Sequence, residues 1–375
     1  MSDELGRRAQ TWSLRQLLTC LVFIGLVGGW AVANRLVAPP IVSQTERRTL
    51  ATMPDLSLSS VTSGTFMSGF EEFAADSFAG REPLRTLKAW TVLYPLAQLD
   101  KSGLYEGDSG VGRFERLNVA SATKVATKIA VVASSLDGLN IYYSFVPDKS
   151  IYAGRYLPGF DPEAARDALA SKLADYTFID LTSVLGADSF YRTDLHWDQT
   201  SLDPVVQTIG AAMGVTTELP SDVATAGDFS GVYAGQLALP VTADQMAYHP
   251  LPSVVTAEYL NATTLAMQPG PVYDLEAFTG QDPYDLFLSG AQPIVRITNP
   301  NATTERELFL FRDSFGSSLA PLLSLDYAHV TCIDLRYISW SLVPDFVTFP
   351  PGSDVLFLYS SQILNSEAVL QVQVP

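Results

Sequence analysis

The stretch that decides the fold is LFLFRDSFGSS, residues 308–318. Its four consecutive apolar residues predict a buried strand, and the small polar residues behind them predict a turn into a helix over 317–324. Ser314 then lies at the carboxyl end of a central strand, where an α/β sheet can expose a nucleophile. The peptide N–H groups at the start of the helix can stabilise a negatively charged oxygen there. The alternative is that Asp313 or Ser314 only caps the helix.

Strands and helices alternate on both sides of this stretch. Strands are predicted over 141–146, 177–181, 294–297, 307–311, 329–335 and 354–359, and helices over 120–136, 162–176, 200–213 and 317–324. Asp161 and Pro162 supply an N-cap and a first helical residue. Residues 215–291 are rich in glycine and proline and poor in helical pattern. The alternation predicts an α/β three-layer sandwich with a mostly parallel sheet.

A histidine is the next requirement for serine chemistry, and the chain contains only His196, His249 and His329. His196 follows Asp194 by two positions, so in an extended segment both side chains leave on the same face. An aspartate can then bond one imidazole nitrogen and leave the other free to act as a base. The alternative is a surface histidine beside a capping aspartate.

The N-terminal segment 17–33 is uncharged and follows Arg7, Arg8 and Arg15. Its length is at the short end for a bilayer crossing, and the basic flank places the N-terminus in the cytoplasm. A cleaved signal peptide ending near 31–33 and a buried core helix are the alternatives. We therefore expect a cytoplasmic tail (1–16), a single transmembrane anchor (17–33), a linker (34–60) and an extracytoplasmic domain (61–375). The protein would reside in the cell membrane.

Composition restricts the chemistry further. The formal net charge of −17 disfavours nucleic-acid binding through phosphates. Cys20 and Cys332 are not expected to pair, since one lies in the apolar N-terminal segment and the other in a strand. The sequence has no zinc-ligand spacing, phosphate loop or dinucleotide fingerprint, so we expect neither metal nor cofactor. Phenylalanines at 66, 70, 73 and 78 predict an amphipathic helix with an aromatic packing face.

Two blocks resemble a known family. Residues 313–315, Asp-Ser-Phe after an apolar strand, resemble the nucleophile block of SGNH (GDSL-type) hydrolases, with Arg312 where many members have glycine. Residues 193–197, TDLHW, resemble the D-x-H-W block of the DHHW family and of AlgX/AlgJ-type polysaccharide O-acetylation proteins. The Asp-His block precedes the serine block, as it does in those families. Shorter matches occur at 146–149 (VPDK), 287–290 (FLSG) and 334–337 (DLRY).

This resemblance implies an SGNH-like fold and a Ser-His-Asp triad. Ser314 would be the nucleophile, His196 the general base and Asp194 its orienting carboxylate. The N–H groups of Ser314 and Gly290 would form the oxyanion hole. Supporting or substrate-contacting positions, each equally open to a structural role, are Tyr191, Asp313 and Arg336.

The resemblance also implies a function. We expect a membrane-anchored O-acyltransferase or esterase that acts outside the cytoplasm on a cell-envelope or extracellular polysaccharide. A multi-spanning membrane O-acyltransferase would supply the acyl group. The alternative is a non-catalytic glycan-binding protein that retains the fold. Hydrolysis of a lipid or small ester has less support from the sequence. Acyl donor, acceptor and oligomeric state do not follow from it.

Overall fold

The computed structural model describes residues 14–36, 40–107, 110–154, 159–216 and 218–374. The chain divides into two compact units, Met1–Lys88 and Ala89–Pro375. Most of the expected cytoplasmic tail lies outside the described residues. The assignment of segments to tail, anchor, linker and outer domain stays a prediction.

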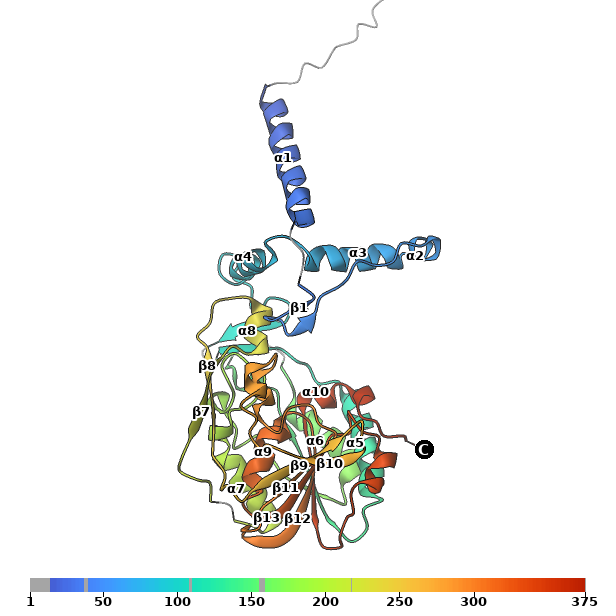
Figure 1. Ribbon diagram of the computed structural model, residues 1–375, viewed down its shortest axis with the longest axis vertical. Coiled ribbons are helices and arrows are strands. Elements are labelled where there is room, and N and C mark those ends of the chain that lie inside the picture. Colours follow the sequence, from blue (N-terminus) through green and yellow to red (C-terminus); the bar gives the residue numbers. More distant parts are fainter. Residues whose placement is uncertain (1–13, 37–39, 108–109, 155–158, 217, 375) are drawn as a thin grey trace, which may run out of the picture. The chain divides into compact units, whose positions relative to one another are not determined.

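An eight-stranded sheet forms the centre of the second unit (Figure 1), in the order β10-β9-β11-β13-β12-β14-β5-β6. Its strands are β5 (Asn140–Val146), β6 (Thr177–Phe178), β9 (Thr256–Asn261), β10 (Ala266–Gly270), β11 (Ile294–Thr298), β12 (Thr304–Arg312), β13 (Tyr327–Ile333) and β14 (Asp354–Ser360). The neighbours from β13 to β6 pair in parallel, whereas β11, β9 and β10 extend one edge antiparallel. The expected mostly parallel α/β sheet is therefore confirmed.

Helices cover both faces of this sheet. They are α5 (Val119–Ala133), α6 (Pro162–Leu173), α7 (Asp203–Met213), α9 (Phe315–Leu323) and the short α10 (Ser361–Leu364). On β12, Phe309 and Phe311 pack with α5 and α6, while Leu308 and Leu310 pack with α7 and α9. Because alternate residues of a strand point to opposite faces, these two clusters lie on opposite sides of the sheet. Helices on both faces of the sheet give the expected three-layer sandwich.

Several helix ends match their sequence signals. Asp161 accepts the N–H of Ala164 as the N-cap of α6, with Pro162 at the first position. Gly214 ends α7 in the left-handed conformation. The strand expected over 177–181 stops at Phe178.

The stretch 215–291 is not only loop. It contains the hairpin β7 (Ala224–Phe229) and β8 (Asp244–Tyr248), the helix α8 (Val232–Leu237), and the pair β9–β10. A further hairpin, β3 (Leu104–Gly107) and β4 (Gly110–Arg113), lies earlier in the chain. Short 3₁₀ turns include Lys149–Tyr152, Gln199–Ser201 and Pro283–Leu286.

The first unit contains α1 (Leu14–Leu36), the short strands β1 (Val42–Ser43) and β2 (Arg48–Thr49), α2 (Leu58–Thr62) and α3 (Thr65–Asp76). Helix α4 (Arg81–Leu93) begins in this unit. Within α1, Leu14–Asn34 is 21 residues long and, by length and composition, apolar enough to cross a membrane. The predicted N-terminal apolar helix and the helix at α3 are both present, but Phe78 lies beyond the end of α3 and Phe70 is exposed, so the expected aromatic packing face is not buried.

Candidate active site

The turn that carries Ser314 is fixed by the carboxylate before it. Asp313 Oδ1 accepts the N–H of Phe315 at 3.0 Å, and its Oδ2 accepts the N–H of Ser360 at the end of β14 at 2.7 Å. Asp313 is therefore the residue that caps the start of α9. Ser314 makes no capping hydrogen bond with its side chain. Its partly exposed hydroxyl is available for another partner.

That partner is His196, which lies 118 positions earlier in the chain. Its Nε2 is 2.8 Å from Ser314 Oγ, and its Nδ1 is 2.7 Å from Asp194 Oδ1. A carboxylate can only accept, so Nδ1 carries the proton and Nε2 can accept the serine O–H. Asp194 and His196 are buried, at 1% and 5% exposure. The structure thus brings together the three residues expected to form the triad.

The backbone between Asp194 and His196 differs from the expectation. Residues 192–196 form a series of bends rather than an extended segment. The N–H of Tyr191 donates to the carbonyl of His196 at 3.0 Å, and the N–H of His196 donates to Asp194 Oδ1 at 3.1 Å. The pairing therefore arises because the aspartate side chain bonds the backbone two residues on, not because of strand alternation.

Two buried charged residues fix this loop from the side. The Lys149 amine donates to the carbonyls of Tyr191 and Asp194, each at 2.8 Å. The carboxylate of Asp244 accepts the N–H groups of Arg192 at 2.8 Å and Thr193 at 2.7 Å. Burial lowers the pKa of Lys149 to about 8. Asp194 Oδ2 is also occupied, since it accepts the N–H of Val232 at 2.8 Å.

Two glycines allow backbone to approach the loop closely. A Cβ on Gly231 would lie 2.4 Å from the carbonyl oxygen of Thr193 and from Asp194 Cβ. A Cβ on Gly110, whose φ is +100°, would lie 2.2 Å from the carbonyl oxygen of Arg192. A larger residue at either position would collide with the loop and displace it.

Aromatic side chains orient the imidazole. The ring of Tyr284 stacks on His196 with centroids 3.7 Å apart and planes 7° from parallel, and Phe315 lies at 5.0 Å. The Tyr284 hydroxyl donates to Ser318 Oγ at 2.7 Å. Burial raises the pKa of Tyr284 well above its usual value, so the hydroxyl stays protonated. The imidazole plane is thereby fixed in line with Ser314.

The remaining candidate residues make their contacts elsewhere. The N–H of Gly290 donates to the carbonyl of Phe287 at 3.3 Å, so it is engaged within its own turn. The Tyr191 hydroxyl donates to the sulfur of Met246 at 3.1 Å, in an aromatic cluster beside the loop. Arg336 forms a bidentate pair with Asp334 at 2.9 and 2.6 Å. These contacts are structural, and a role for the three residues at the site stays a prediction.

Sequence reasoning missed the residues that support the triad. Lys149 lies in the short VPDK match at 146–149, but that match did not indicate a role for it. Asp244 and Tyr284 lie in the irregular stretch 215–291, where a single carboxylate or tyrosine forms no pattern. Among the described residues, no group of three or more His, Cys, Asp or Glu side chains could bind a metal.

Comparison with known proteins supports the fold. Neither a scan against family models nor a search of curated proteins gave a match. Among solved structures, a DHHW family protein from Eubacterium siraeum aligns with TM-score 0.59 and 20% identity, covering 72% of this chain and 94% of that one. The chain has the fold of a DHHW family protein. The expected SGNH-like α/β class is thereby confirmed at the level of the fold.

Two further proteins are similar. Bacillus cereus PatB1 aligns with TM-score 0.55 and 18% identity, covering 72% of this chain and 99% of that one. PatB1 with a sulfonyl adduct aligns with the same TM-score at 16% identity, covering 72% and 98%. The O-acetyltransferase domain of Pseudomonas putida AlgJ aligns with TM-score 0.41 and 15% identity, covering 70% and 92%. That last similarity is too distant to support a conclusion about this chain.

Proposed function

We propose that the protein is a membrane-anchored O-acyltransferase or esterase that acts outside the cytoplasm on a cell-envelope or extracellular polysaccharide. The observation that carries the proposal is the continuous hydrogen-bonded series Asp194–His196–Ser314, with heavy-atom distances of 2.7 and 2.8 Å. These distances lie within the range in which a base can remove a proton from a nucleophile.

The first half of the reaction loads the serine. Ser314 Oγ attacks the carbonyl carbon of an acyl ester while His196 Nε2 takes the hydroxyl proton. The negative oxygen that develops is stabilised by the N–H of Ser314 at the start of α9. His196 then gives its proton to the departing alcohol, and the acyl group remains on Ser314 as an ester. Asp194 stabilises the imidazolium in between.

The second half repeats these steps with a new acceptor. A sugar hydroxyl loses its proton to His196, attacks the acyl carbon and leaves as the acylated sugar, while the proton returns to Ser314. Water in the same position gives the free acid. Transferase and esterase therefore differ only in the acceptor that reaches the acyl-serine.

Membrane attachment is the second part of the proposal. Leu14–Asn34 is long and apolar enough to span a bilayer. The arginines that precede it favour a cytoplasmic N-terminus, and the triad-bearing unit would then lie outside. A donor delivered by a multi-spanning membrane O-acyltransferase is compatible with this arrangement. The fold shared with a DHHW family protein and PatB1 supports the proposed enzymatic activity by analogy, and it does not bear on the membrane attachment.

The test uses the full chain with a chromogenic acetyl ester and a polysaccharide acceptor. We expect ester cleavage that Ser314→Ala abolishes, with acetyl groups appearing on the polysaccharide for a transferase and only as acetate for an esterase. A matched control is Ser134→Ala, because Ser134 is exposed at the end of α5 and its hydroxyl donates to the carbonyl of Val131, away from the candidate site. Equal activity in wild type and Ser314→Ala refutes the catalytic proposal.

A sulfonyl fluoride provides a test that needs no natural substrate. PatB1 has been solved with a sulfonyl adduct, and an activated serine reacts with such reagents. We expect stoichiometric modification of Ser314 that His196→Ala slows by about 10²–10⁴-fold, the usual contribution of a general base. If Ser314 does not react while the chain binds glycan, the non-catalytic glycan-binding alternative is correct.

A further inference from the structure

Helix α4 exposes leucines and turns two of its arginines inward, unlike a typical surface helix of a soluble protein. Leu84 and Leu87 are 37% and 55% exposed. The side chains of Arg81 and Arg85, on the other face, are only 13% and 14% exposed. In water a surface helix presents its charges outward and its leucines inward. The exposed leucines indicate that the outer face of α4, which also carries the exposed Lys88, meets an apolar medium.

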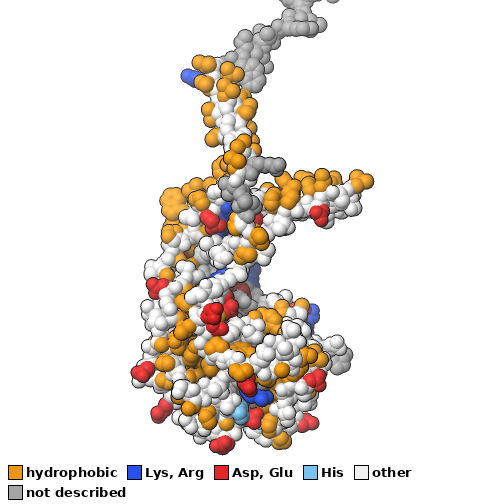
Figure 2. Space-filling model, viewed as in Figure 1, with side chains coloured by type: hydrophobic (Ala, Val, Ile, Leu, Met, Phe, Trp, Pro, Cys, Tyr) orange, Lys and Arg blue, Asp and Glu red, His pale blue; other side chains and the backbone are white. Residues whose placement is uncertain are grey.

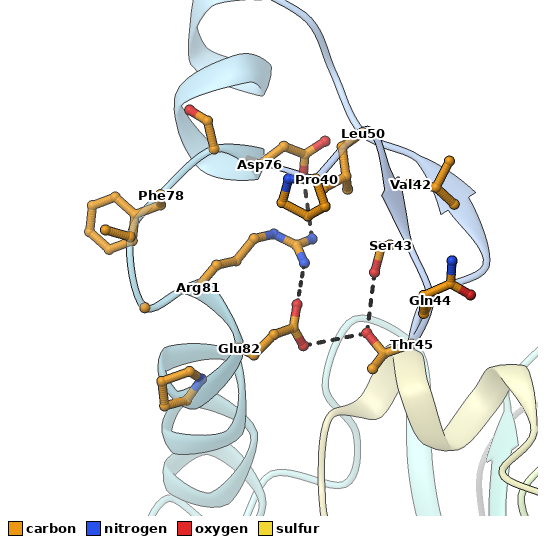
Figure 3. A pocket seen from close by; sticks show the side chains of 14 residues that line it. Pro40, Val42, Ser43, Gln44, Thr45, Leu50, Asp76, Phe78, Arg81 and Glu82 are labelled. Carbon is orange, nitrogen blue, oxygen red and sulfur yellow. Dashed lines mark hydrogen bonds and ion pairs between the residues drawn. The ribbon is translucent and has the colours of Figure 1, made fainter. Parts of the chain in front are cut away.

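The inward charges of α4 form an ion-pair network within the first unit, and Figure 3 shows the contacts of Arg81 with Asp76 and Glu82. Arg81 also pairs with Glu46 and lies 3.3 Å from Asp76, and Arg85 lies 3.3 Å from Glu46. Asp76 also receives a bidentate contact from Arg48 at 2.8 and 2.6 Å. That contact lowers the pKa of Asp76 to about 2, so this carboxylate stays charged at physiological pH. The pairs fix which face of α4 points outward.

Helix α3 adds a second exposed apolar face. Met67 and Phe70 are exposed, and the rings of Phe66, Phe70 and Phe73 follow one another along this side at 6.1 and 6.5 Å. Glu72 lies on the opposite side of the helix, by the 3.6-residue repeat. Figure 2 shows hydrophobic side chains gathered along α3 and α4 on the side where α1 leaves.

The end of α1 contacts the turn between these two helices. The rings of Trp30 and Phe78 stack with centroids 4.4 Å apart, and Asn34 Oδ1 accepts the N–H of Ala79 at 2.6 Å. The 21 residues of Leu14–Asn34 span about 32 Å as a helix, close to the thickness of a hydrocarbon core. Trp30 then lies at the interfacial depth typical of tryptophan. The α3–α4 turn must lie at the same depth.

We propose that the exposed apolar faces of α3 and α4 lie in the outer membrane–water interface and form, with α1, an L-shaped membrane anchor. We call this surface the interfacial face, and its exposed members are Met67, Phe70, Phe78, Leu84 and Leu87. The occupant is the lipid bilayer that α1 enters, because the surface is continuous with the end of that helix. An amphipathic helix of this kind lies about 5–10 Å into the headgroup and acyl boundary.

The charge arrangement also predicts how the surface binds. Because Arg81 and Arg85 point into the protein, they are not available to attract anionic headgroups. Apolar burial therefore supplies the attraction. Lys88 is the exposed lysine of α4, so anionic lipid should strengthen insertion of the interfacial face only slightly, and salt should weaken it only slightly.

The test places single cysteines on the full chain, in phosphatidylcholine nanodiscs loaded with one chain each. Cys20 is replaced by alanine, and Cys332 stays, because it is buried with a pKa raised to about 11. Met67→Cys and Leu87→Cys report the interfacial face, and Glu72→Cys is the matched control on the polar side of α3. Each carries a polarity-sensitive fluorophore, and quenching is measured with nitroxide-labelled lipid and with aqueous iodide.

We expect the labels at 67 and 87 to emit at shorter wavelength and to be quenched by lipid nitroxide about twofold or more strongly than the label at 72, with the reverse order for iodide. Equal iodide quenching at all three sites overturns the proposal. So does shielding that occurs only in discs loaded with two or more chains, since a second copy would then be the occupant. The proposal rests on the anchoring by α1, and failure of that anchoring is distinguishable because the chain would not stay with the discs.

Discussion

Lys149 is predicted to matter more for activity than for stability. In the variant Lys149→Met, the carbonyls of Tyr191 and Asp194 lose the donor that bonds each at 2.8 Å. Two buried acceptors left without a partner cost about 2–6 kcal/mol together. The variant also removes a buried charge. Burial lowers the pKa of Lys149 from 10.5 to about 8, and that shift corresponds to a penalty of about 3 kcal/mol at neutral pH.

These two effects have opposite signs. The free energy of unfolding should therefore fall by no more than about 3 kcal/mol in Lys149→Met. The loop that carries Asp194 and His196 loses a lateral contact, and a displacement of about 1 Å at a reacting group costs about 100-fold in rate. We expect the rate of Ser314 acylation to fall by that factor while the chain remains folded.

The assay compares acylation rates well below the unfolding temperature with urea unfolding of the same samples. Lys172→Met is the control, because Lys172 is an exposed lysine on α6. An acylation rate within about threefold of wild type would refute the positioning role, since a displaced base should cost far more. Loss of rate that only parallels loss of folded protein would refute it equally.

Three further predictions concern the same unit. Asp194→Asn should reduce Ser314 acylation by about 10³–10⁴-fold with little change in fold, because the amide no longer enforces the Nδ1–H tautomer; a loss below tenfold contradicts this. Gly231→Ala should lower the free energy of unfolding in urea by about 1–3 kcal/mol and slow acylation, since the new Cβ would collide with Thr193 and Asp194. The control Gly186→Ala, which has open space around its Cβ, should change neither stability nor acylation. Burial, and then the charge of Asp148, raises the pKa of Glu115 to about 7. The folded state therefore retains a proton that the unfolded chain loses above about pH 4.5, and stability falls as pH rises from there to about 7. Glu115→Gln should remove that fall and gain up to about 3 kcal/mol at pH 8, and an unchanged pH profile would contradict the assignment.

The parts of the fold that the sequence predicts are those with one dominant local signal. The apolar run 308–311 is buried on both faces of the sheet. Such a continuous apolar run predicts a central strand without any knowledge of its neighbours. Strands β9 and β10 were not predicted because both are short and partly exposed, and β10 contains proline and glycine. The antiparallel edge that they form with β11 depends on tertiary pairing, which no local pattern records.

The same distinction between local signals and long-range contacts applies to the candidate site. Ser314, His196 and Asp194 were predicted as a site because reactive residue types occur in two short blocks that resemble a family. Their supports were not, because Asp244 and Tyr284 act through contacts between distant segments, at separations of about 50 and 90 positions from the loop. The backbone conformation of the Asp-x-His segment was predicted incorrectly for a related reason. Side-chain-to-backbone bonding, rather than strand period, determines it.

The most direct test of the central claim is the covalent state of Ser314 after brief exposure to an activated acetyl ester. Peptide mass spectrometry of wild type should find one acetyl group, on the peptide that contains Ser314, and this group should be lost on further incubation with polysaccharide or water. His196→Ala should acquire the group at least about 100-fold more slowly. Acetylation at other residues only, or at the same rate in His196→Ala, would contradict the proposal that these residues form a catalytic triad.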